Sequence, residues 1–263
     1  MDEKKKKSKA APIAGANDRV CEHLSFAAKE AFKRLRTNLM LKVPEGDRCH
    51  IVGVTSAQPS EGKSTIALNL SYSLAELGKK VLLLDADMRR PSIHLKARIE
   101  RTPGLADLLG DSNSITACVR KYQSSKNETV FDILPGGNIP PNPSELLNSR
   151  RMATLLETLR SAYDYIIIDL PPVGAVIDAI SVSKNTDGMI VVLRENHCPI
   201  GVFKDCVAQI QESNVPILGF VMNGALEGSG KKYGYGYGYG KGYGSYKSYG
   251  GYYGNYYGSY YGS

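Results

Sequence analysis

The 263-residue sequence lacks the features that mark several special classes of protein. No apolar run approaches the roughly 18–20 residues that cross a bilayer, so we expect no membrane-spanning helix. Charged residues open the chain where a secretory signal would carry an apolar core, so we expect no such signal. The five cysteines show no CxxC spacing and the four histidines no ligand spacing. A reduced cytosolic protein is therefore favoured over a disulfide framework or a metal site built from these residues.

Net charge is absent from most of the chain, although the whole sequence carries +7. Residues 1–9 contribute +3 and residues 231–263 contribute +4 without one acidic residue, which leaves the segment between them balanced. The basic character belongs to the two ends, so we expect no nucleic-acid partner.

Composition divides the chain into three parts. Residues 1–20 are rich in Lys and Ala and are predicted to form a disordered basic arm. Residues 21–225 are predicted to fold, and residues 226–263 to form a disordered tail. Within that tail, residues 231–263 hold 11 glycines and no aliphatic residue. The tail carries 13 of the 17 tyrosines: Tyr233, Tyr235, Tyr237, Tyr239, Tyr243, Tyr246, Tyr249, Tyr252, Tyr253, Tyr256, Tyr257, Tyr260 and Tyr261.

The central part alternates short apolar runs with helical patterns. Strands are expected at residues 50–56, 80–87, 130–134, 163–170, 188–194 and 216–222. Helices are expected at residues 26–42, 63–77, 104–109, 145–160, 178–185 and 200–212. Continuous Ile, Val and Leu runs suit strands that are covered on both sides. The pattern predicts an α/β fold with a mainly parallel sheet flanked by helices on both faces, and ligands beyond the carboxyl ends of the strands.

The strongest motif is AQPSEGKST at residues 57–65, between an expected strand and an expected helix. This context is the one a phosphate-binding P-loop requires, and it disfavours a chance match in a surface turn. The motif consists of Ala57, Gln58, Pro59, Ser60, Glu61, Gly62, Lys63, Ser64 and Thr65. Backbone N–H groups of Glu61 to Lys63 are expected to surround a β-phosphate, the Lys63 ammonium to reach the β- and γ-phosphates, and the Ser64 hydroxyl to bind Mg²⁺. Ala57 stands where the motif has its first glycine, so the first turn must adopt a conformation that alanine tolerates.

Acidic residues follow two of the apolar strands: Asp85 and Asp87 after one, and Asp169 after the other. At the carboxyl ends of strands they are expected to hold Mg²⁺ directly or through water, which we favour over simple capping of the next turn.

The roles of three further residues remain open from the sequence pattern alone. Arg89 and Arg90 suit either phosphate contact or solvent. Asn223 suits either recognition of an adenine edge or an ordinary turn.

Four motifs in order make the chain resemble the bacterial tyrosine kinases of capsule and exopolysaccharide synthesis. They are the P-loop, LLLDADMR at 82–89, IIIDLPP at 166–172 and the tyrosine cluster at the C-terminus. The segment GGNIPPNPSELLNS at 136–149 is similar to the family's loop between the second and third motifs. The likeness covers about residues 26–223 and the tail, and it implies a P-loop NTPase fold of the partition-ATPase-like type.

The resemblance also implies residue roles. Lys63 and the P-loop would bind ATP, Ser64, Asp85 and Asp169 would surround Mg²⁺, and Asp87 would accept or orient the tyrosine hydroxyl. Glu30, Lys33 and Arg36 align with the family's oligomerisation motif, in which Lys33 replaces an arginine and loses its bidentate geometry. Leu170 replaces the family's usual hydroxyl residue.

As a kinase of this family, the chain would phosphorylate its own tail between subunits of a ring-like homo-oligomer and regulate polysaccharide polymerisation and export. A separate membrane-embedded activator, the chain-length regulator, would recruit it from the cytoplasm to the inner face of the membrane, and a phosphotyrosine phosphatase is expected to reverse the reaction. One alternative is a non-kinase ATPase switch of the partition type, although those proteins usually carry a lysine where this chain has Gln58. Another is an aromatic tail that drives assembly.

Overall fold

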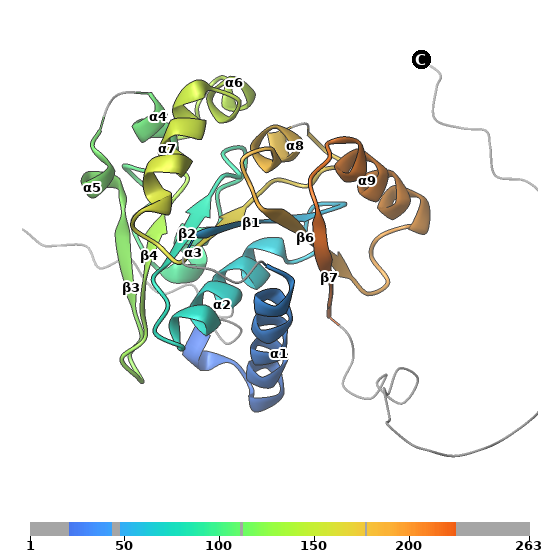
Figure 1. Cartoon of the computed structure of the whole chain (residues 1–263), viewed down its shortest axis with the longest axis horizontal. Coiled ribbons are helices and arrows are strands. Elements are labelled where there is room, and N and C mark those ends of the chain that lie inside the picture. Colours follow the sequence, from blue (N-terminus) through green and yellow to red (C-terminus); the bar gives the residue numbers. More distant parts are fainter. Residues whose placement is uncertain (1–20, 44–47, 111–112, 177, 225–263) are drawn as a thin grey trace, which may run out of the picture. The chain divides into compact units, whose positions relative to one another are not determined.

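The computed structural model describes residues 21–43, 48–110, 113–176 and 178–224 (Figure 1). The chain divides into a unit of residues 1–225 and a unit of residues 226–263. The predicted basic arm at 1–20 and the predicted tail, with all 13 of its tyrosines, lie outside the described residues. Among the described residues, no helix combines the length and apolar character needed to cross a membrane.

A seven-stranded sheet forms the centre of the first unit, in the order β3-β4-β2-β5-β1-β6-β7. Only the β3–β4 pair is antiparallel, and β3 and β7 are the edge strands. The strands are β1 (His50–Ser56), β2 (Val81–Asp85), β3 (Arg120–Gln123), β4 (Val130–Leu134), β5 (Tyr165–Asp169), β6 (Gly188–Arg194) and β7 (Ile217–Asn223). The predicted mainly parallel sheet is confirmed.

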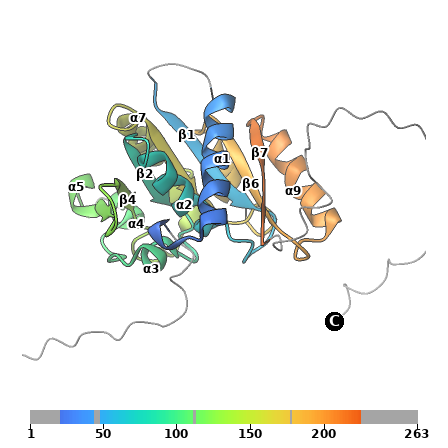
Figure 2. The same cartoon turned by 90° about the horizontal axis from the view of Figure 1, so that it is seen from below.

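Helices cover both faces of the sheet, as predicted. They are η1 (Cys21–His23), α1 (Phe26–Lys42), α2 (Lys63–Ala75), α3 (Ile93–Ala97), α4 (Leu105–Leu109), α5 (Ile115–Cys118), α6 (Pro143–Leu147), α7 (Arg150–Arg160), α8 (Asp178–Ser183) and α9 (Ile200–Glu212). Figure 1 shows α1 and α2 on one side of the sheet and α7, α8 and α9 on the other, and Figure 2 shows α1 and α2 in front of the strands.

Alternate residues of the strands pack into two separate hydrophobic cores, one on each face of the sheet. Val52, Leu83 and Ile167 point to the face covered by α1, α2 and α3. Ile51 and Leu82 point to the face covered by α4 to α9. Because successive side chains of a strand point to opposite faces, a strand that is buried on both faces must be apolar throughout. The uninterrupted runs in the sequence have this cause.

Some expected elements differ in the structure. The single helix expected at 145–160 is two helices, because Ser149 accepts a hydrogen bond from the Met152 backbone N–H at 3.3 Å and so starts α7 anew. The short elements η1, β3, α3 and α5 were not predicted. The strand β3 has the sequence RKYQ, whose polar edge character gives no apolar signal.

A buried carboxylate joins the start of the described chain to the β3–β4 hairpin. Glu22 of η1 accepts hydrogen bonds from the Tyr122 hydroxyl at 2.6 Å and from the Ser125 backbone N–H at 3.2 Å. Burial alone would raise the pKa of Glu22, but the hydrogen bonds from Tyr122 and Ser125 outweigh it and the pKa is lowered. The contact therefore fixes η1, and with it the start of α1, against the opposite edge of the sheet from β7.

The lowered pKa gives a pH-dependent prediction for Glu22→Gln. Above the ordinary glutamate value of 4.5 the charged carboxylate contributes its full stabilisation, which is lost as the pH falls through the lowered folded-state pKa. We expect the substitution to lower the free energy of unfolding by about 1–2 kcal/mol near pH 7 and by much less near pH 2.5. Urea unfolding at both pH values measures the difference, with exposed Glu128→Gln on the same hairpin as the control. An equal loss at both pH values would assign the effect to packing instead of charge.

Candidate active site

The P-loop connects the end of β1 to the start of α2. Gly62, the residue before α2, has φ +96°, and a Cβ there would collide with the side-chain amide of Asn223. That amide donates a hydrogen bond to the Glu61 carbonyl at 2.8 Å. The backbone N–H groups of the first turn of α2 have no intrahelical acceptor and begin the helix at its positive end. The loop thus has the construction of an anion site.

Ala57 is accommodated because the left-handed turn lies elsewhere in the loop. The positive φ values of the loop belong to Ser60 and Gly62, and Ala57 is buried. Its carbonyl oxygen packs against Gly174, where a Cβ would lie only 2.6 Å away. The close approach therefore depends on the missing side chain of Gly174, and residue 57 itself keeps a conformation that alanine tolerates.

The Glu61 carboxylate fixes the shape of the loop from within. It is fully buried and accepts hydrogen bonds from the backbone N–H of Gln58 at 2.8 Å and of Arg194 at 3.3 Å. The first bond closes the loop on itself and the second ties it to the end of β6. The motif predicts a role only for the backbone of Glu61, because nothing in the sequence shows that β6 ends beside it.

Lys63 lies at the centre of a buried charge cluster. Its ammonium is 2.8 Å from Asp87 Oδ2, 3.5 Å from Asp169 Oδ1 and 3.4 Å from the Ser64 hydroxyl. Burial alone would lower the pKa of Lys63, but the Asp169 and Asp87 carboxylates outweigh it and raise the pKa. The structure thus brings together four residues that the sequence placed in three separate motifs.

The two strand-end acids lie side by side because Asp85 and Asp169 are register partners in the β2–β5 pair. Burial, reinforced by Asp169, raises the pKa of Asp85 to about 8. Asp85 Oδ2 accepts backbone N–H bonds from Ser92 and Ile93, both at 3.1 Å, so Asp85 also anchors the start of α3. These bonds show that Asp85 caps the next turn, and its predicted role in holding Mg²⁺ stays a prediction.

Asp169 offers a better fit to Mg²⁺. It is fully buried, and its Oδ2 atom has no hydrogen-bond partner among the described residues. The Ser64 hydroxyl, a second oxygen donor, hydrogen-bonds to the same carboxylate. No group of three His, Cys, Asp or Glu side chains with metal-binding geometry occurs in the described part of the chain. Mg²⁺ commonly takes one or two protein oxygens plus water and phosphate, so this sparse donor set suits it.

The guanidinium of Arg89 has protein partners, which favours a structural role over a free phosphate contact. Its guanidinium pairs with the buried Asp178 of α8 at 2.7 Å and donates to the Ser144 hydroxyl of α6 at 2.9 Å. Ser144 also donates to Asp178 at 2.6 Å. These bonds fix the chain segment that follows Asp87 to the helices on the α4–α9 face. Arg90 remains exposed at the pocket wall.

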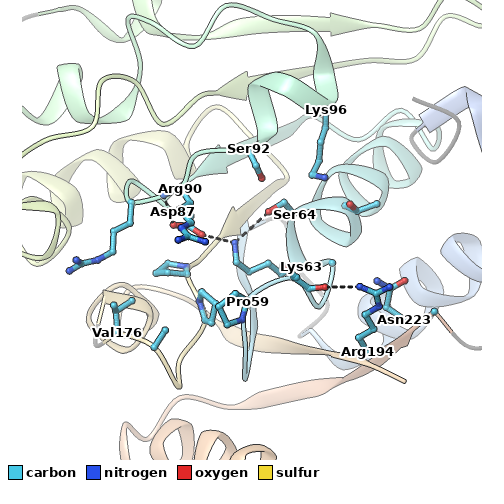
Figure 3. A pocket seen from close by; sticks show the side chains of 18 residues that line it. Pro59, Lys63, Ser64, Asp87, Arg90, Ser92, Lys96, Val176, Arg194 and Asn223 are labelled. Atoms are coloured by element: carbon cyan, nitrogen blue, oxygen red, sulfur yellow. Dashed lines mark hydrogen bonds and ion pairs between the residues drawn. The ribbon is translucent and has the colours of Figure 1, made fainter. Parts of the chain in front are cut away.

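A cavity of about 680 Å³ lies beside the P-loop and Asp87 (Figure 3), a size within the usual range of small-molecule sites. The predicted Lys63, Ser64, Thr65, Asp87 and Asn223 line it, together with Pro59, Ser60 and Gly62. Sequence reasoning missed several lining residues that belong to no motif of their own: Ser92, Lys96, Ala175, Val176 and Arg194. Pro171 and Pro172 also line it, and their place directly after Asp169 was the available signal.

The predicted oligomerisation residues lie on α1, away from this cavity. Lys33 and Glu30 form an exposed ion pair at 2.7 Å. Arg36 instead donates to the Ser73 carbonyl of α2 at 2.6 Å, and its buried Nε atom has no hydrogen-bond partner among the described residues. Their role between subunits stays a prediction. Leu170 is buried in the core of the α4–α9 face.

Comparisons with known proteins agree with this geometry. A family model described as an AAA domain matches residues 50–216. The chain is 37% identical over 199 residues to tyrosine-protein kinase YwqD of Bacillus subtilis, which covers 74% of this chain and 80% of that protein. It spans only 26–29% of the length of some longer curated tyrosine kinases.

Solved structures show the same relationship. The kinase domain of Escherichia coli tyrosine kinase ETK matches with a TM-score of 0.72 and 31% identity over 80% of each chain. The septum site-determining protein MinD of Pyrococcus horikoshii, in complex with Mg-ADP, matches with a TM-score of 0.55 and 25% identity, covering 68% of this chain and 72% of that one. The predicted family and its partition-ATPase-like fold are thereby confirmed: the chain belongs to the bacterial tyrosine-protein kinases, enzymes built on a P-loop nucleotide-binding domain.

Proposed function

We propose that this chain transfers the γ-phosphoryl group of Mg-ATP to tyrosine hydroxyls in the C-terminal tail of another copy of itself. The observation that carries the proposal is the contact of Lys63 with Asp87 and Asp169 at one end of the pocket, in a chain whose last 33 residues hold 13 tyrosines. Phosphoryl transfer needs positioned groups and neutralised charge more than a strong base, and this site supplies both.

The ion pair between Lys63 and Asp87 suggests how nucleotide binding prepares the site. The Lys63 ammonium lies 2.8 Å from the Asp87 carboxylate and neutralises its charge. Phosphate oxygens compete for the same ammonium, so ATP binding frees Asp87 to accept the proton of the incoming tyrosine. The tyrosine oxygen then forms a bond to the γ-phosphorus while the bond from the β,γ-bridging oxygen breaks, and ADP leaves. Ser64 and Asp169 would hold Mg²⁺, which would neutralise charge at the phosphates.

Regulation of polysaccharide export, recruitment by a membrane-embedded activator and reversal by a phosphatase follow from the family resemblance and form part of the same proposal. Asn223 donates to the Glu61 carbonyl of the P-loop and lines the pocket, so we assign it a loop-positioning role, and we propose the adenine contact, which the sequence left open, as its second role.

Lys63→Met tests the proposal directly. We expect at least a hundredfold loss of phosphotyrosine formation with ATP and an activating partner, because the variant removes the cation that neutralises transferring phosphate charge. Quantitative phosphotyrosine blotting measures the loss, and circular dichroism controls for folding. A wild-type signal no stronger than that of the variant would refute the proposal, and ATP hydrolysis without phosphotyrosine would favour the partition-type ATPase switch.

Mixing two chains, one without kinase activity and one without tail acceptors, tests transfer between copies. A Lys63→Met chain keeps its acceptor tyrosines, while a chain with all 13 tail tyrosines changed to Phe keeps its active site. Phosphotyrosine on the Lys63→Met chain, resolved by a size tag, is expected in the mixture alone. If the wild type is active but the Lys63→Met chain carries no phosphotyrosine in the mixture, transfer occurs only within one chain.

A further inference from the structure

Lys96 of α3 presents a cation without a protein partner to the active-site cavity. It lines the pocket with Lys63 and Ser64, and Figure 3 shows its side chain extending from α3 toward that pocket. In the described part of the chain, no hydrogen bond or ion pair involves its ammonium. Lys63 differs, because its ammonium has three polar neighbours.

The position of Lys96 is fixed by the catalytic strand ends. Asp85 accepts the backbone N–H groups of Ser92 and Ile93, which start α3. Ile93 and Ala97 of the same helix are buried in the core with α2. Lys96 lies between Ile93 and Ala97 in sequence, so these contacts place it beside the cavity that the first turn of α2 also lines.

The surroundings of Lys96 are those of the phosphate end of the cavity. The side chain is half-buried, and this burial lowers its pKa, while the charges of Asp169 and Lys63 act on it in opposite directions. An ammonium that is partly removed from water without a partner is destabilised until an anion pairs with it. Asp169 hydrogen-bonds to Ser64 and pairs with Lys63 but forms no hydrogen bond or ion pair with Lys96, which leaves the Lys96 ammonium available to an anionic ligand.

We propose that Lys96 is a second phosphate-binding lysine, which donates a hydrogen bond from Nζ to an oxygen of the γ-phosphate of ATP. This inference rests on the proposed function only in taking ATP as the ligand. The β-phosphate is served by the P-loop N–H groups, whereas residues such as Ser64 and Asp169 would hold a metal at both the β- and γ-phosphates in P-loop sites. Lys96 lies on that side, so it distinguishes ATP from ADP. No motif of the sequence contains it.

The test compares the binding of a non-hydrolysable ATP analogue with that of ADP, both with Mg²⁺, by isothermal titration calorimetry on the full chain. For Lys96→Met we expect the affinity for the analogue to fall about ten- to hundredfold and the affinity for ADP to change less than about threefold. Lys96→Arg is expected to stay within a few-fold of the wild type, since it keeps the charge. Lys204→Met, an exposed lysine on α9, is the control and is expected to change neither affinity.

The outcomes separate this inference from the proposed kinase activity. Equal affinities of Lys96→Met and the wild type for the analogue would overturn the role of Lys96, whatever the kinase assay shows. Equal losses for the analogue and ADP would also overturn it, because they would assign Lys96 to the part of the nucleotide that both share. A selective loss for the analogue in a chain that forms no phosphotyrosine would support Lys96 and refute the kinase proposal alone.

Discussion

Asp87→Asn is expected to lower the rate of tyrosine phosphorylation about a hundred- to ten-thousandfold without weakening the binding of Mg-ATP. Asp87 accepts from Lys63 at 2.8 Å through Oδ2 and from the Arg90 backbone N–H at 3.1 Å through Oδ1, and the single amide oxygen of asparagine can keep one of these two contacts. The amide cannot accept a proton at neutral pH, so tyrosine activation is lost. Removal of a negative charge beside the phosphates leaves the ATP affinity equal or higher.

Single-turnover phosphorylation and calorimetric ATP binding measure the two effects separately. Asp205→Asn, which changes an exposed carboxylate on α9, is the matched control for the loss of one charge. If ATP affinity falls in parallel with the rate, Asp87 serves nucleotide binding and its assignment as the proton acceptor is wrong.

Glu61→Ala is expected to destabilise the protein by about 2–5 kcal/mol and to weaken ATP binding strongly. The substitution leaves the N–H groups of Gln58 and Arg194 without their acceptor, and each unsatisfied buried donor costs about 1–3 kcal/mol. Without the internal carboxylate the loop loses its fixed shape, so its N–H groups no longer converge on one phosphate.

Denaturant unfolding and ATP titration measure both losses, with Glu212→Ala at the exposed end of α9 as the control. Glu61→Gln is expected to fall between the wild type and alanine, because its amide oxygen replaces one of the two acceptor contacts. A normal ATP affinity in a destabilised Glu61→Ala protein would show that the carboxylate supports the fold but does not shape the phosphate site.

Most of the sheet could be predicted because its strands are buried on both faces. The runs ending at Asp85 and Asp169 are wholly apolar, and β1, β4 and β6 occupy the predicted ranges without change. The parallel arrangement then required the acids to meet at one edge, which the structure shows in the Asp85–Asp169 register pair.

The unpredicted parts depend on contacts between distant segments. Lys96 lies in a five-residue helix with no pattern of its own, and only the hydrogen bonds from α3 to Asp85 bring it to the cavity. The pairing of Arg89 with Asp178 joins residues 89 positions apart. Local propensity and spacing contain no information on such pairs.

The strand order has a consequence for how the protein is made. Strand β1 lies between β5 and β6, so both of its neighbours are more than a hundred residues further along the chain. During synthesis β1 has no pairing partner until residues 165–169 have emerged, and it stays an unpaired edge until residues 188–194 follow. Such long-range pairing is slow and exposes apolar strands meanwhile. The P-loop directly follows β1, so its shape depends on the pairing of that strand. We therefore expect the phosphate site to form late in folding, and nucleotide binding to require the assembled sheet.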